Sequence, residues 1–68
     1  MADATYQKIE IVGTSPNSFY EAAANGVAKA AETVPHMSWF EVIEERGSIV
    51  GGKIAQYQVT LRIGARME

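Results

Sequence analysis

The chain has 68 residues and a net charge of −2, and its acidic and basic residues are interspersed, which argues against nucleic acid as a partner. It shows no signal-peptide pattern and no apolar run near the roughly 20 residues that span a bilayer, so we expect a cytoplasmic protein without membrane contact. The length predicts one domain, residues 1–68, with a marginal core, and because cysteine is absent, self-association is the expected support.

The first predicted element is a strand over residues 5–12, in which apolar and polar side chains alternate. Its apolar face carries Ile9 and Ile11, and its polar face carries Lys8 and Glu10. The run Gly-Thr-Ser-Pro at 13–16 is expected to break this strand. A helix follows, capped either by the serine at 15 with its following proline or by the serine at 18 with a glutamate three residues on.

The helix is predicted over residues 19–34, where small and apolar residues repeat at helical spacing. This stripe consists of Phe19, Ala22, Ala23, Gly26, Val27, Ala30, Ala31 and Val34. Small residues predict a helix lying close on a sheet, and Gly26 in its interior suggests close approach of a neighbouring backbone. Pro35 disfavours helical dihedrals at Val34 and should end the helix there.

Two further strands are predicted, one from Trp39 through Arg46 or beyond and one from Lys53 to about Arg66. Gly47 suggests a bulge in the first, and the Gly-Gly pair at 51–52 supplies a hairpin loop. The order β-α-β-β predicts an α+β fold, a three-stranded antiparallel sheet with the last strand in the middle and the helix on one face.

The helix is expected to cover a face that carries Ile9, Ile11, Phe40, Val42, Tyr57, Val59, Leu61 and Ile63. The other face then carries Trp39, Ile43 and Gln58 and is left bare. An aromatic plane beside an amide suits a flat heteroaromatic ligand, and packing against another copy of the chain is the alternative. Arg46 and Arg66 are either solvated or placed to hold a phosphate.

Catalytic patterns are missing from the sequence. There is no nucleophilic cysteine, no Gly-x-Ser-x-Gly, no phosphate-binding glycine loop and no dinucleotide fingerprint, so no enzyme is predicted. Glu44 and Glu45 are adjacent in a strand and point to opposite faces. The single histidine, His36, cannot build a nitrogen-rich metal site and is expected near the helix end, against terminal carbonyls or in solvent.

Nearly the whole chain resembles the dodecins of bacterial type. The resemblance rests on the run Ile-Glu-Ile-Val-Gly-Thr-Ser at 9–15, the alanine-rich helix, Trp-Phe-Glu-Val at 39–42, Arg-Gly at 46–47 and Tyr-Gln-Val at 57–59. It implies a β-α-β-β subunit that assembles into a hollow homododecamer. It also implies that flavins bind as pairs at two-fold interfaces, sandwiched between two tryptophans.

The same resemblance implies roles for individual residues. Trp39 would stack on the isoalloxazine ring, Gln58 would hydrogen-bond its polar edge, and Arg46 would lie near the flavin tail. Less directly, Tyr6 and Arg66 would help to hold a phosphate.

The mild charge and Phe40 match bacterial members, which favour FMN; riboflavin is a further candidate. Some bacterial members also bind coenzyme A, to which no residue is assigned here. The function implied is flavin storage and protection without turnover, in which the stacked indole quenches the excited flavin. The alternative that remains open is an oligomeric structural or protein-interaction module that binds no flavin.

Overall fold

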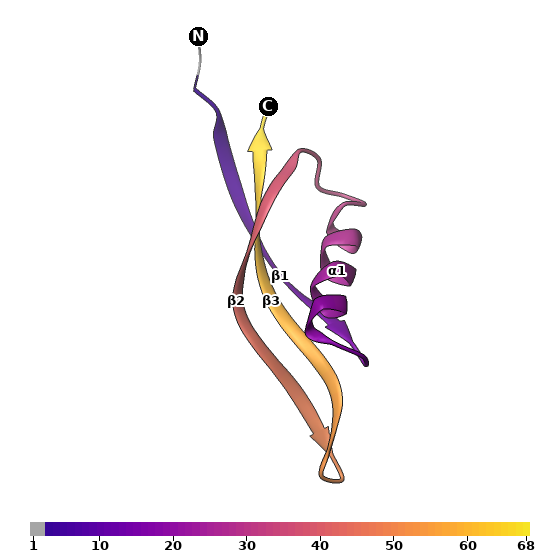
Figure 1. The fold of residues 1–68 in the computed structure, drawn as a ribbon. Helices are drawn as coiled ribbons and strands as arrows, with labels where there is room; N and C mark the ends of the chain where they lie inside the picture. The colour runs from indigo at the N-terminus through magenta and orange to yellow at the C-terminus, as the bar shows by residue number, and fades with distance from the viewer. Residues whose placement is uncertain (1–2) are drawn as a thin grey trace.

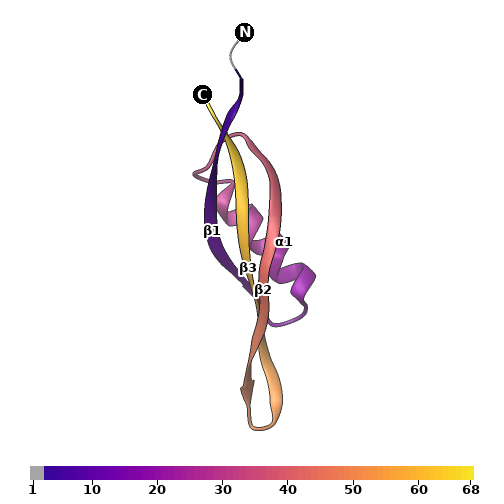
Figure 2. The same ribbon diagram turned by 90° about the vertical axis from the view of Figure 1, so that its left-hand side faces the viewer.

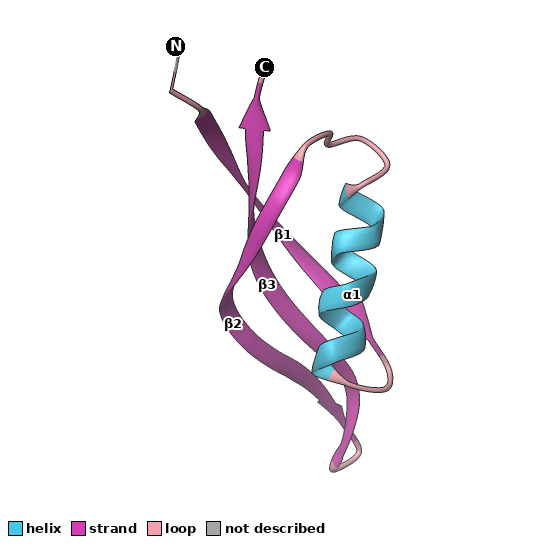
Figure 3. Cartoon of the chain, turned by 45° about the horizontal axis from the view of Figure 1, so that its top comes forward, coloured by secondary structure: helices cyan, strands magenta, loops and turns pink. Residues whose placement is uncertain are grey.

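A computed structural model describes residues 3–68, and the elements follow the predicted order (Figure 1). They are β1 (Thr5–Ser15), α1 (Phe19–Ala30), β2 (Met37–Val50) and β3 (Lys53–Met67). The three strands form one antiparallel sheet in the order β1-β3-β2, with β3 in the middle. The helix lies on one face of this sheet, and the other face is bare (Figures 2 and 3). The predicted fold class is confirmed.

The hairpin between β2 and β3 turns at Gly51 and Gly52, as predicted. Their φ angles are 58° and 76°, a combination of two left-handed residues that suits the right-handed twist of paired strands. Residues with a Cβ adopt this region at a cost, so glycine is favoured at both positions.

The core forms where α1 presses on β3 and β1. Ala22, Val59 and Leu61 are almost fully buried, and partly buried apolar side chains of β1 and α1 pack around them. Gly13 does not break β1, which continues to Ser15 and not to the predicted Val12. A Cβ on Gly13 would lie 3.1 Å from the Cα of Gly26 and would overlap the Ala22 carbonyl oxygen. The strand therefore uses this glycine to let the helix approach.

The structure decides between the two predicted starts of α1 and shortens its predicted end. Ser18 is the N-cap, and its hydroxyl accepts a hydrogen bond from the backbone N–H of Glu21 at 3.0 Å. The alternative cap, Ser15, donates instead to the Glu21 carboxylate at 3.0 Å. At the other end the helix stops at Ala30 and not at Val34. The backbone N–H groups of Glu32 and Thr33 donate to the carbonyl oxygens three residues back, which tightens the chain into turns after Ala30.

The irregularities of β2 are not where the sequence placed them. Gly47 pairs regularly with Tyr57, and the register shifts lie between residues 37 and 39, 42 and 44, and 48 and 49. The second shift leaves Ile43 as an extra residue, so the alternation of faces changes beyond it. Arg46, which simple alternation would put under the helix, comes to lie opposite Gln58 on the bare face.

The helix covers only part of its face of the sheet. It packs on β1 and β3 and makes little contact with β2. Phe40 and Val42, predicted to fill the core, pair with Ile63 and Leu61 on the helix side but remain 53% and 50% exposed. The hairpin also projects beyond α1 (Figure 1). In residues 3–68 no helix is long and apolar enough to cross a membrane.

Candidate functional site

Trp39 lies on the bare face of the sheet, directly opposite Gly64 of β3. A Cβ built on Gly64 would lie 2.3 Å from Cε2 and Cζ2 of the indole, so the ring occupies the space that any other residue would need. A glycine inside a strand often marks such a close approach. The indole is nevertheless 40% exposed, which leaves a large aromatic surface in contact with solvent.

Tyr6 extends this aromatic surface from β1. Its ring centroid is 5.0 Å from that of Trp39, and the two planes are inclined by 57°. Tyr6 is itself 42% exposed and pairs in register with Arg66. The structure therefore brings together three of the predicted site residues, Trp39, Tyr6 and Arg66, at one end of the bare face.

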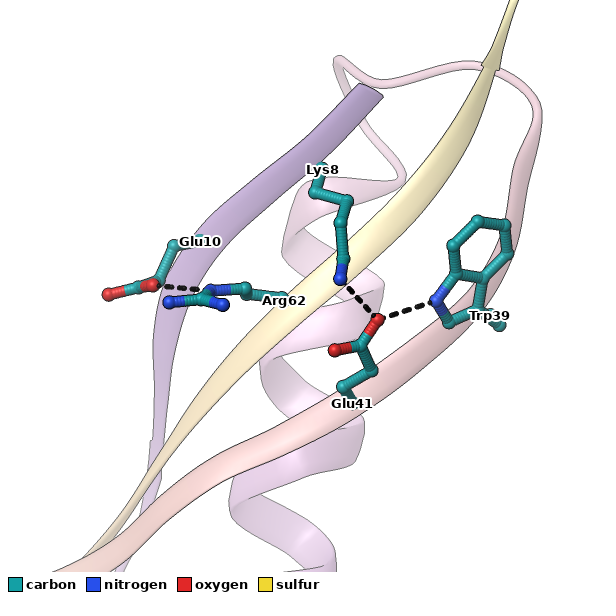
Figure 4. A network of polar contacts seen from close by, with 5 residues as sticks. All are labelled: Lys8, Glu10, Trp39, Glu41 and Arg62. Carbon is teal, nitrogen blue, oxygen red and sulfur yellow. Dashed lines mark hydrogen bonds and ion pairs between the residues drawn. The ribbon is translucent and has the colours of Figure 1, made fainter. Parts of the chain in front are cut away.

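A polar network holds the edge of the indole (Figure 4). The Trp39 Nε1–H donates to the Glu41 carboxylate at 3.0 Å, and Lys8 Nζ lies 2.8 Å from the same oxygen. Alongside, Arg62 Nε donates to Glu10 at 3.0 Å. The pKa of Glu41 is lowered from its ordinary 4.5, mainly by the hydrogen bond from Lys8 and to a smaller extent by the one from Trp39. This carboxylate is therefore ionised at neutral pH.

Gln58 and Arg46 lie at the other end of the bare face. Arg46 and Thr14 flank Gln58 on the neighbouring strands, and the Gln58 amide donates to the side-chain oxygen of Gln56 at 2.9 Å. Gln58 and Gly64 are six residues apart on β3, which at the rise of an extended strand is about 20 Å. Gln58 therefore shares a face with Trp39, as predicted, but not a pocket within one chain.

The remaining candidates have simpler surroundings. His36 is exposed, with a positive φ of 62°, and its Nε2 lies 3.1 Å from the Glu68 carboxylate, so it makes an ion pair when protonated. Among residues 3–68 no group of three or more histidine, cysteine, aspartate or glutamate side chains is placed to hold a metal ion.

Three residues of the site were not singled out from the sequence: Gly64, Glu41 and Lys8. A signal in the sequence could have identified two of them, Gly64 and Glu41. Gly64 is the one glycine inside the long third strand. Glu41 follows Trp39 by two residues and so shares its face, where a carboxylate can reach the indole N–H.

Comparison with known proteins gives a consistent result. The family model described as Dodecin matches residues 5–68. The curated dodecin of Thermus thermophilus is 43% identical over 63 residues, which cover 93% of this chain and 91% of the relative. The "Calcium dodecin" of Mycobacterium tuberculosis is 32% identical over 62 residues, 91% of this chain and 87% of that protein.

A solved structure agrees with these sequence relatives. The dodecin of Streptomyces coelicolor superimposes with a TM-score of 0.95 at 43% identity, covering 100% of this chain and 97% of that one.

Proposed function

The chain belongs to the dodecin family, and we propose that it binds and stores a flavin, FMN or riboflavin, by stacking the isoalloxazine ring on Trp39. The observation that carries this proposal is the large exposed aromatic surface of an indole packed against Gly64 and bordered by Tyr6. A side chain this apolar gains from being covered, and a flat conjugated ring covers it with favourable stacking.

The binding site is completed by a second subunit. Gln58 is about 20 Å from the indole along its own strand, farther than one flavin ring system reaches. An amide at the polar edge of the ring therefore comes from a neighbouring chain, and a homododecamer with paired flavins at two-fold interfaces meets this requirement. Arg66 and Tyr6 lie beside the indole of the same chain, and Arg46 accompanies Gln58. These cationic and hydroxyl groups suit the phosphate of FMN.

The stored flavin is protected from photochemistry by the indole that holds it. An electron-rich indole in contact with an excited flavin donates an electron and recovers it, which returns both molecules unchanged. Binding thus lowers the concentration of free flavin and limits its side reactions. No turnover is involved, and the protein acts as a buffer and not as an enzyme.

Fluorescence titration of FMN with the protein tests this function. The wild type is expected to quench flavin emission, and Trp39→Ala is expected to weaken FMN binding by about tenfold or more through loss of stacking. Tyr20→Ala is the matched control, because Tyr20 is an aromatic residue of α1 that is 84% exposed and lies on the helix side. Equal quenching by wild type and Trp39→Ala protein would refute the stacking site.

Two alternatives are distinguished by the same titration. A purely structural or protein-interaction module would assemble but leave FMN emission unchanged. The name of the mycobacterial relative points instead to calcium. The FMN titration is therefore repeated in calcium chloride and in EDTA. Equal quenching in both solutions would show that flavin binding does not depend on calcium, whereas quenching only in calcium chloride would show that the site needs the ion.

A further inference from the structure

Glu41 connects the aromatic surface to the charged groups of the sheet. A single carboxylate oxygen, Oε2, accepts from Trp39 Nε1 at 3.0 Å and lies 2.8 Å from Lys8 Nζ. The lysine comes from β1 and the other two side chains from β2, so the contacts bridge across the central strand above Gly64 (Figure 4). Trp39, Glu41 and Lys8 are called the indole clamp below.

The indole clamp fixes the orientation of the Trp39 ring, which packing against Gly64 alone does not determine. The contact with Gly64 limits how close the indole can come to the sheet, but the ring could still turn about its side-chain torsions. Its only polar atom is the Nε1–H donor, so the position of the acceptor decides which edge points toward the sheet and which surface stays open. A bond to an ionised acceptor is stronger than a neutral one.

The charges around the clamp keep its carboxylate in place. Lys8 from β1 and Arg62 from β3 are the cations that face Glu41, and both favour its ionised form. Glu10 from β1 is the other acid on this part of the face, and it is paired with Arg62 at 3.0 Å and not with the indole. Of these two acids, only Glu41 accepts the hydrogen bond from the Trp39 Nε1–H.

We propose that Glu41 is a positioning residue that holds the indole of Trp39 in the orientation that receives a stacked ligand, with Lys8 orienting the carboxylate. The identity of the ligand rests on the proposed flavin function. The positioning does not, because it exists in the free protein and can be measured there.

The single tryptophan of the chain makes the first test direct, since all indole emission comes from Trp39. In the flavin-free protein, Glu41→Ala is expected to lower the fluorescence anisotropy of the indole, because the ring moves more freely on the nanosecond timescale. Lys8→Met is expected to give a smaller decrease, and Glu41→Gln a partial one, because an amide oxygen still accepts from the N–H. Glu10→Gln is the control and should match the wild type.

The acid titration of the free protein gives a second readout. The pKa of Glu41 is lowered, so the carboxylate is ionised at and above the ordinary value of 4.5 and becomes protonated only at lower pH, where its bond to the indole weakens because a neutral oxygen is a poorer acceptor. Indole emission of the wild type should therefore show a transition below that pH. The transition should persist in Glu10→Gln and disappear in Glu41→Gln.

The FMN titration then links positioning to binding. Glu41→Ala is expected to weaken FMN binding about three- to tenfold, as for loss of one hydrogen bond, with the oligomer size unchanged. If Trp39→Ala leaves FMN binding intact, the flavin function is wrong, whatever Glu41 does to the indole. If Trp39→Ala abolishes binding while Glu41→Ala changes neither anisotropy nor affinity, or Glu10→Gln changes both equally, the positioning role is overturned.

Discussion

Trp39 and Gly64 depend on each other across two strands. The indole occupies the volume that a Cβ on Gly64 would take, and the missing side chain lets a large ring lie close to the backbone while 40% of it stays exposed. The pairing of the two residues follows from the register of β2 on β3. A residue in a central strand usually places its own side chain on one face of the sheet, whereas Gly64 leaves that space to the Trp39 ring.

Gly64→Ala should therefore displace the indole and weaken FMN binding by about tenfold or more, since the added methyl group cannot be accommodated without moving the ring. Fluorescence titration measures the affinity, and circular dichroism checks that the sheet is retained. Val12→Ala, a truncation of an exposed side chain on the same face, is the control. Wild-type affinity in Gly64→Ala would mean that the indole does not need its observed position.

At the scale of elements, α1 and β1 meet through a pair of glycines. Gly13 of β1 and Gly26 of α1 face each other so closely that a Cβ on either one would contact the Cα of the other, at 3.1 and 3.2 Å. The sequence indicated the close approach at Gly26 correctly but assigned Gly13 to a break in the strand. Glycine serves both to end a strand and to let a helix approach it closely, so the sequence alone does not tell the two roles apart. Only the partner across the interface, here Gly26, distinguishes them.

The two glycines should respond differently to alanine. Gly13→Ala is expected to lower the free energy of unfolding by about 2–3 kcal/mol, because its Cβ would overlap the fixed carbonyl oxygen of Ala22. Gly26→Ala should stay within about 1 kcal/mol of the wild type, since the gain in helix propensity offsets a milder contact. Urea denaturation at one fixed subunit concentration measures both. A larger loss in Gly26→Ala than in Gly13→Ala would contradict this ranking.

At the scale of the whole molecule, a single chain exposes more surface than a compact monomer of its mass. Its accessible surface is 4908 Å², against about 4,200 Å² expected for a compact monomer of this mass. The chain is 57 Å long and 13 Å thin, and a helix of 12 residues, about 18 Å, covers only part of it. Large apolar side chains remain exposed on the helix side of β2 and at the hairpin, among them Phe40, Val42, Ile49 and Ile54. Burying them against other copies is the source of stability that we expect.

Phe40→Glu should therefore shift the protein toward smaller species, because a charge replaces an apolar contact between subunits. Size-exclusion chromatography with light scattering measures the mass, and FMN quenching should fall with it if Gln58 is supplied by a neighbouring chain. Thr33→Glu adds the same charge at an exposed turn and is the control. Full quenching by a monomeric Phe40→Glu protein would place the whole flavin site within one chain.

The sequence alone determined the element order, the central position of β3, the Gly-Gly hairpin and the presence of Trp39 on the face without a helix. These features follow from local rules of periodicity and turn chemistry, which act within a few residues. The tertiary structure decided what depends on contacts between strands. The extra residue at Ile43 moved Arg46 to the bare face, and the register placed Gly64 under the indole and Gln58 at the far end. A strand's alternation does not reveal where a bulge interrupts it, because the bulge is set by the pairing with its neighbour.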